Sequence, residues 1–314
     1  MINKICPAQA TAISRSVRTF ELALVSVLLL IMSEVTFAGG PWVLPRGSAY
    51  FALGYSRKTA DAIWSVEGKT TPRTSLHDFR YYYFTADLGL APKLSASFLL
   101  TYLDGFEGPQ DDMERNTGLS DAWVSLKYRF KEGTYPMAIS AALRTPILYD
   151  ISGAYSRNLY DNRGNMLGHS PEWRGLLKHD LTFSYHIGRS LPNRGWTNAE
   201  IGFTWREGAP ANQIPFPVEA GYGLPLPGFR LKGSSLWVFS LGNDSPRAPE
   251  DRFGFTPGGI QNFNDASMGR LGASLLIDAW QATGLTLEIG YNQWIWGRSA
   301  RQYKEPFIAL SRGI

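Results

Sequence analysis

The chain has 314 residues, of which 44% are hydrophobic and 18% charged, and its formal net charge is +4. Its single cysteine, Cys6, excludes a disulfide framework and a cysteine-rich metal site. The weak positive charge is not gathered into a basic tract, so the composition does not indicate a nucleic-acid partner.

The first 38 residues have the pattern of a secretory leader. Lys4, Arg15 and Arg18 precede the apolar run 22–32, and the small residue Ala38 marks the expected cleavage boundary. A basic segment, a short apolar run and a small-residue boundary are typical of a cleaved signal peptide. The apolar run is also shorter than the roughly 20 residues of a membrane-spanning helix. We therefore predict a signal peptide at 1–38 and an exported domain at 39–314, with an uncleaved anchor as the alternative.

Alternation with a period of two recurs along the exported part. In the segment GLSDAWVSLKYRF, apolar residues occupy every second position from Ala122 to Phe130, and Asp121, Ser125 and Lys127 stand on the other row. This period predicts strands, and the frequent glycine, proline and aromatic residues suit many strands joined by turns. We expect about twelve strands, at 48–57, 77–88, 93–103, 120–130, 136–145, 176–188, 196–206, 216–224, 229–241, 267–278, 284–296 and 303–312.

The connections between these strands alternate in length. Short connections, such as 89–92 and 131–135, take turns with long ones, such as 104–119, 146–175 and 242–266. Short turns at one rim and long loops at the other are typical of an up-and-down membrane barrel. The predicted fold class is therefore all-β: a transmembrane antiparallel barrel of about twelve strands, with short periplasmic turns and long extracellular loops.

The alternation alone also fits a soluble sandwich or a lipocalin-like barrel, in which the apolar face points inward. Two features of the strands favour the membrane form, and the predicted export signal fits it as a third. Aromatic residues stand at the ends of the apolar rows, as in interfacial girdles. The polar rows carry both signs of charge, which can pair across a wet lumen, whereas each would cost about 2–4 kcal/mol facing lipid at the midplane. The predicted lumen-lining residues are Lys127, Arg129, Arg144, Lys178, Asp180, Glu200, Arg206 and Glu219.

Three stretches resemble one family. GLSDAWVSLKYRF (118–130) resembles the Gly-Leu-Gly-Asp-Leu-Trp-Leu-Gly-Leu-Lys-Tyr-Arg pattern of the outer-membrane β-barrel porins named after a phenol-degradation meta-pathway component. GPWVLPRGSAYFALGYS (40–56) resembles the opening of XagA-like proteins, which are linked to exopolysaccharide and biofilm loci. ADLGLAPKLSASFLLTY (86–102) is similar to a turn between strands in the same family. The resemblance implies a membrane barrel that passes small hydrophobic or uncharged compounds or serves a secretion system, and it implies no binding residues.

An enzymatic barrel is the rival class. The histidines of the pairs His77-Asp78 and His179-Asp180 each face away from the neighbouring aspartate, because adjacent strand residues point to opposite faces. Ser184 and His186 share a face but stand about 7 Å apart along the strand, so we interpret them as a solvated lumen pair. No hydrolase or phosphate-binding motif occurs in the sequence. We therefore predict no enzymatic activity, no cofactor and no metal site.

The long loop 146–175 is the candidate constriction or ligand-binding loop. Its aromatic residues, Tyr149, Tyr155, Tyr160 and Trp173, can form a stacking surface for a sugar or an aromatic compound, or fold into the lumen. A surface loop without such a role is the alternative, because long loops are either functional or disordered.

The sequence as a whole predicts a porin-like channel or transport component for small solutes in the bacterial outer membrane. A structural or secretion-associated barrel for exopolysaccharide or biofilm matrix is the first alternative, and a barrel hydrolase is a remote one. The expected partners are outer-membrane lipid, the barrel assembly machinery, and small hydrophobic solutes or polysaccharide.

Overall fold

The computed structural model describes residues 40–65, 67–72, 76–108, 114–147, 157–160, 166–170, 179–206, 211–242, 266–279 and 284–314. The predicted leader at 1–38 lies outside these residues. All regular elements among the described residues are strands. That part of the chain contains no helix of the length and hydropathy needed to cross a membrane.

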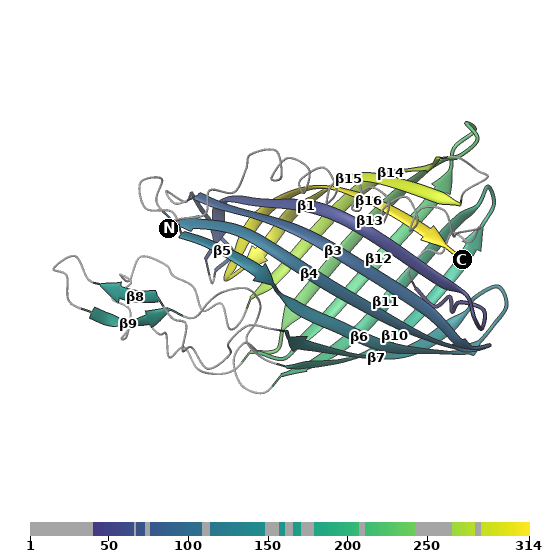
Figure 1. The fold of residues 1–314 in the computed structure, drawn as a ribbon, viewed down its shortest axis with the longest axis horizontal. Helices are drawn as coiled ribbons and strands as arrows, with labels where there is room; N and C mark the ends of the chain where they lie inside the picture. The colour runs from purple at the N-terminus through teal and green to yellow at the C-terminus, as the bar shows by residue number, and fades with distance from the viewer. Residues whose placement is uncertain are drawn as a thin grey trace, which may run out of the picture.

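Twelve long strands form one closed antiparallel barrel (Figure 1). Each strand pairs with the next long strand of the sequence, and β16 returns to pair with β1 from Tyr50 opposite Gly313 to Trp64 opposite Ala300. Closure gives each of these twelve strands a partner on both sides, which satisfies backbone hydrogen bonds that lipid cannot satisfy. The barrel strands are β1 (Ala49–Trp64), β3 (Leu76–Ala91), β4 (Leu94–Gly108), β6 (Asp121–Lys131), β7 (Met137–Pro146), β10 (Asp180–Leu191), β11 (Gly195–Arg206), β12 (Gln213–Gly223), β13 (Phe229–Ser240), β14 (Ser267–Ala279), β15 (Leu285–Arg298) and β16 (Ala300–Gly313).

Four short strands lie at the long-loop rim. β2 (Thr70–Pro72) pairs with the end of β1, and β5 (Glu114–Leu119) pairs with the end of β4, so both extend the wall. β8 (Arg157–Tyr160) and β9 (Met166–Ser170) form a separate two-stranded sheet, which Figure 1 shows beyond the left end of the barrel.

The twelve predicted strands and the alternation of short turns with long loops are confirmed. Several strands are longer than predicted at the long-loop rim: β1 continues from residue 57 to Trp64, and β4 from residue 103 to Gly108. The predicted boundaries stopped where the apolar row gives way to charged residues such as Arg57 and Asp104. Backbone pairing continues past these residues, because a ladder depends on backbone groups and not on the hydropathy of the side chains.

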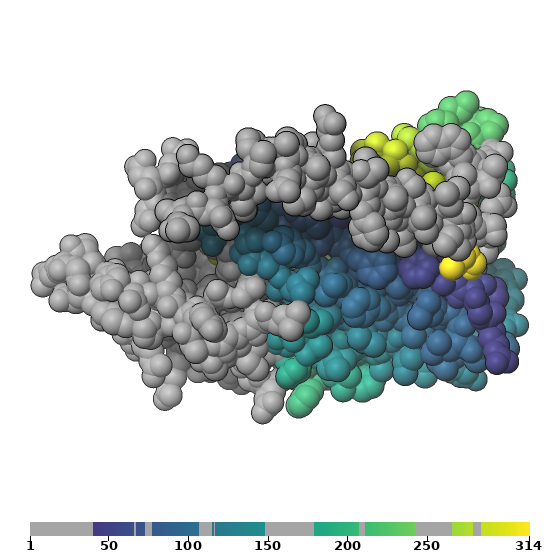
Figure 2. Space-filling view, in the orientation of Figure 1, coloured from purple at the N-terminus to yellow at the C-terminus, as the bar shows by residue number. Residues whose placement is uncertain are grey.

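The barrel is apolar outside and polar inside. Its outward positions carry exposed large apolar side chains such as Leu53 (61% exposed), Leu126 and Ile201, whereas buried inward positions include His186 and Arg230. Figure 2 shows one face of this wall, coloured purple to teal, where side chains of β1, β3, β4 and β6 pack side by side. This arrangement inverts that of a soluble barrel and defines a transmembrane one.

Candidate functional site

The segment that precedes β1 lies against the inner wall of the barrel. The ammonium Nζ of Lys127 on β6 donates a hydrogen bond of 2.6 Å to the carbonyl oxygen of Gly40. The backbone N–H of Leu44 donates one of 3.0 Å to the hydroxyl Oγ of Ser95 on β4. Residues 40–48, named here the entry segment, therefore occupy part of the lumen at the short-turn rim.

Two glycines of the wall make room for the entry segment. A side chain at Gly188 on β10 would meet the rings of Pro41 and Trp42, and one at Gly89 on β3 would meet the carbonyl of Pro45. The backbone of Gly89 also bonds to the segment, since its carbonyl accepts from the N–H of Gly47 at 2.9 Å. The glycines of the wall thus leave the space that the entry segment occupies.

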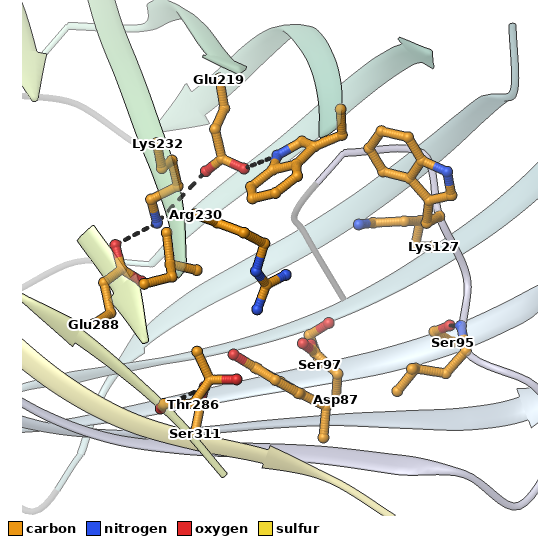
Figure 3. A pocket seen from close by; sticks show the side chains of 15 residues that line it. Asp87, Ser95, Ser97, Lys127, Glu219, Arg230, Lys232, Thr286, Glu288 and Ser311 are labelled. Atoms are coloured by element: carbon orange, nitrogen blue, oxygen red, sulfur yellow. Dashed lines mark hydrogen bonds and ion pairs between the residues drawn. The ribbon is translucent and has the colours of Figure 1, made fainter. Parts of the chain in front are cut away.

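A cavity of about 200 Å³ lies between the entry segment and the opposite wall. Trp42 and Leu44 line it from the segment, and Tyr50 and Leu276 are among the wall residues that line it. Figure 3 shows polar side chains converging on it from several strands, with Arg230 extending into the space. The polar lining consists of Asp87, Ser95, Ser97, Lys127, Glu219, Arg230, Lys232, Thr286, Glu288 and Ser311.

Several of the charged residues that line this cavity form ion pairs. The ammonium of Lys232 lies 2.5 Å from the carboxylate of Glu288 and 3.9 Å from that of Glu219 (Figure 3). The indole N–H of Trp196 donates to Glu219 at 2.7 Å, and the guanidinium of Arg230 lies 2.6 Å from the carboxylate of Asp278. Opposite charges at such distances compensate one another, so the cavity presents fixed dipoles and no large field of one sign.

A second ion cluster lies in the lumen nearer the long-loop rim. Asp180, only 1% exposed, forms ion pairs with both Arg144 and Arg206, the latter at 2.9 Å. Arg144 also lies 3.6 Å from Asp121 and stands over the indole ring of Trp123. Removing water from these groups is unfavourable, and mutual pairing offsets that penalty. The cluster therefore ties β6, β7, β10 and β11 together on the lumen side.

A third polar group surrounds His186. Its ring nitrogen Nε2 lies 2.8 Å from the hydroxyl Oγ of Ser140, and Nδ1 lies 3.2 Å from a carboxylate oxygen of Glu200. Both partners lie on neighbouring strands, since Ser184, two residues away on the same strand, stands about 7 Å along it. His186 is also buried instead of solvated. The order of the three groups and the distances between them match a hydroxyl–imidazole–carboxylate relay.

The predicted lumen residues distribute over these clusters. Lys127 and Glu219 line the cavity, Arg144, Asp180 and Arg206 form the second cluster, and Glu200 contacts His186. Arg129 lies instead at the short-turn rim, where its guanidinium meets Glu132 at 3.0 Å.

The remaining predicted site residues lie in the loop 146–175 or just after it. Lys178, Tyr149, Tyr155 and Trp173 lie outside the described residues. Tyr160 is the last residue of β8, and its side chain is not described. A constriction built by loop 146–175 therefore stays a prediction.

Sequence reasoning missed the entry segment. The predicted first strand begins at residue 48, and no structural element is predicted between the leader and that strand. Two prolines flanking Trp42, Val43 and Leu44 were the available signal, because proline prevents this stretch from joining a ladder while its apolar residues still need cover. The described residues hold no group of three or more potential metal-ligating side chains.

No family model matches the chain, and no curated protein matches it. Among solved structures, an outer-membrane channel from Pseudomonas putida F1 is similar with a TM-score of 0.62 at 11% identity, over 89% of this chain and 100% of that chain. The two chains share a fold. The translocator domain of the autotransporter NalP from Neisseria meningitidis has a TM-score of 0.45 at 8% identity, over 97% of each chain. The β-domain of a Bordetella autotransporter has a TM-score of 0.45 at 12% identity, over 84% of this chain and 98% of that chain.

Proposed function

We propose that the chain is a bacterial outer-membrane channel for small solutes whose passage is controlled by the entry segment. The observation that carries this proposal is the cavity of about 200 Å³, which the segment bounds on one side and polar groups of both signs bound on the other. Export through a cleaved leader at 1–38, folding by the barrel assembly machinery and a non-enzymatic mode of action belong to the same proposal. The shared fold with a channel from Pseudomonas putida F1 supports it.

The charge pattern limits the solute class. Ion pairs such as Lys232 with Glu288 and Arg230 with Asp278 leave little uncompensated charge along the route. A route of this kind favours small uncharged or weakly polar solutes, with weak ion selectivity. Passive movement of the solute through the lumen is part of the same proposal.

A reversible tether of the entry segment tests the proposal. Leu44→Cys and Ser95→Cys place two thiols where the segment meets β4, in a chain whose native thiol is removed by Cys6→Ser. The refolded protein is inserted in a planar bilayer and recorded oxidised and then reduced. We expect low conductance when oxidised and larger steps after reduction, with Leu44→Cys alone as the control insensitive to redox state. Equal conductance in both states would overturn the role of the segment.

A structural barrel associated with exopolysaccharide or biofilm matrix is the second candidate. Buried ion pairs such as Asp180 with Arg144 and Arg206 favour it, because ion-paired side chains that project into a narrow lumen can close it. A deletion strain separates the two. Reduced solute uptake with intact surface polysaccharide supports the channel, and the reverse supports the structural barrel.

A further inference from the structure

A row of tyrosines crosses the outer surface of three neighbouring strands near the long-loop rim. Tyr55 of β1, Tyr82 of β3 and Tyr102 of β4 are paired in register, and their rings lie 5.2 Å and 6.3 Å apart. Aromatic rows of this kind mark the level where hydrocarbon meets lipid headgroups. Figure 1 shows β1, β3 and β4 side by side at the front of the barrel.

Charged residues take over the outward positions directly beyond this row. The next register row holds Arg57, Arg80 and Asp104 in sequence across the three strands. The row after it brings Asp78 and Arg115 to the same surface. These five residues, named here the arginine cluster, point outward because they continue the alternation of the exposed tyrosines.

In the arginine cluster the aspartate side chains are buried and the arginine side chains are exposed. Arg57 donates to Asp78 with two hydrogen bonds, of 2.9 and 2.6 Å, and Arg115 donates to Asp104 at 2.8 Å. Arg80 lies between the acids, 3.9 Å from each. The two aspartate side chains are 6% and 12% exposed, whereas those of Arg57, Arg80 and Arg115 are 48%, 39% and 61% exposed.

An arginine that already forms an ion pair with one carboxylate can still bind a second anion through its remaining N–H groups. Its guanidinium carries five N–H donors, of which a carboxylate takes at most two. Arg80 and Arg115 also stand 5.5 Å from the ring of Phe106, which helps to hold both forks in position. Three cations against two anions leave a net charge of +1 and several outward donors, a combination that suits phosphate.

An apolar groove lies directly below the arginine cluster. It has a volume of about 540 Å³ and is lined by Leu53, Tyr82, Phe84, Leu100 and Tyr102, among others. The groove faces the hydrocarbon, while the arginines face the headgroups. At the other end of β3 the outward residues are Leu88 and Leu90, so this strand does not repeat the arrangement at its opposite rim.

We propose that the arginine cluster and the groove bind one phosphorylated lipid of the leaflet at the long-loop rim. The arginines hold phosphate groups of its headgroup, and an acyl chain lies in the groove. The continuity of the cluster with the lipid-facing surface selects a lipid over a soluble anion. This inference rests on the barrel spanning a membrane and not on its acting as a channel, so either proposal can fail alone.

The test measures binding of bisphosphorylated lipid A and of its dephosphorylated form to the detergent-solubilised full-length chain by native mass spectrometry. The triple variant Arg57→Gln/Arg80→Gln/Arg115→Gln should bind the phosphorylated lipid about tenfold or more weakly, given the strength of hydrogen bonds to charged groups. The matched control, Arg129→Gln/Arg189→Gln/Arg194→Gln, removes the same charge at the opposite rim and should bind like the unaltered protein. Equal binding of the two lipid forms would overturn the proposal.

A second variant keeps the test decisive where the triple variant fails to fold. Asp78→Asn/Asp104→Asn frees the arginines from their carboxylates and should tighten binding of the phosphorylated lipid. Unchanged or weaker binding by this folded variant would contradict the assignment. Inorganic phosphate serves as a competitor, and its displacing the lipid at equal concentration would replace the lipid site with a simple anion site.

Discussion

The ammonium of Lys127 donates a hydrogen bond of 2.6 Å to the carbonyl oxygen of Gly40, and this contact joins the barrel wall to the chain that enters its lumen. The contact is partly buried, so the bond is stronger than the same contact at an exposed surface. Lys127 is therefore the residue by which β6 holds the entry segment in place.

Replacing Lys127 by methionine should loosen the segment. Methionine keeps the length of the side chain and removes the donor, so the carbonyl of Gly40 loses its partner. We expect more frequent or larger openings in single-channel recordings. Lys131→Met removes an exposed cation of the same strand and should leave the traces unchanged. Unchanged traces for Lys127→Met as well would show that other contacts suffice.

Replacing Asp180 by alanine should destabilise the barrel. The change leaves Arg144 and Arg206 facing one another without their shared acid, and breaking a buried pair typically lowers the unfolding free energy by about 3–5 kcal/mol. Urea titration of the protein folded into vesicles measures the loss. Asp61→Ala breaks an exposed pair with Lys304 and should cost less than about 1 kcal/mol. Equal losses would mean that solvent reaches the Asp180 cluster.

Replacing Lys232 by glutamine should make an open channel prefer cations. Glu219 and Glu288 lose the ammonium between them and present two uncompensated carboxylates to the route. The reversal potential in a salt gradient should shift toward the cation equilibrium potential. Lys93→Gln changes the same charge at a turn between β3 and β4 and serves as the control. A shift of equal size in both variants would point to overall charge instead of the site.

An arginine substitution on the outer wall should destabilise the protein most where that wall faces the hydrocarbon of the membrane. Leu126 is 51% exposed in the middle of the outward row of β6. Leu126→Arg should lower the unfolding free energy in vesicles by about 2–4 kcal/mol, whereas Leu226→Arg in a turn should lower it by about 0–1 kcal/mol. Similar small losses at both positions would contradict a lipid-facing wall.

Ser140 should not react as a catalytic nucleophile, despite its place beside His186 and Glu200. Its strand, β7, pairs on both sides along this stretch, so the neighbouring backbone N–H groups are engaged and do not form an oxyanion hole. We expect no labelling by a fluorophosphonate probe under conditions that label a serine hydrolase. Labelling that disappears in Ser140→Ala would support the hydrolase alternative.

Strand number, strand order and the in–out alternation were predictable from the sequence, because side chains on a closed wall alternate strictly between lipid and lumen. The same period of two places members of the arginine cluster on the outward face: Arg57 lies two residues after Tyr55, and Arg80 lies two residues before Tyr82. The predicted strands include Arg57, Asp78 and Arg80, but strand 93–103 ends before Asp104 and strand 120–130 begins after Arg115, so the complete cluster was missed.

The contacts inside the lumen were not predictable in the same way. Register decides that His186 meets Ser140 and Glu200, and register depends on pairings between strands that a single strand does not encode. The position of the entry segment depends on the space left by Gly89 and Gly188, which is a property of the finished barrel. Periodicity identifies the face of a residue, and only the assembled wall identifies its partner.

The pairing of β1 with β16 joins the two ends of the barrel sequence, whereas the other barrel pairings join long strands that follow one another. Neighbouring hairpins can form with small losses of chain entropy, but this last seam requires both ends of an eleven-interface sheet to meet. Until they meet, two strand edges stay open and can pair with another protein. The seam is therefore the place where folding finishes, and a mutation there should slow closure more than an equal mutation elsewhere in the wall.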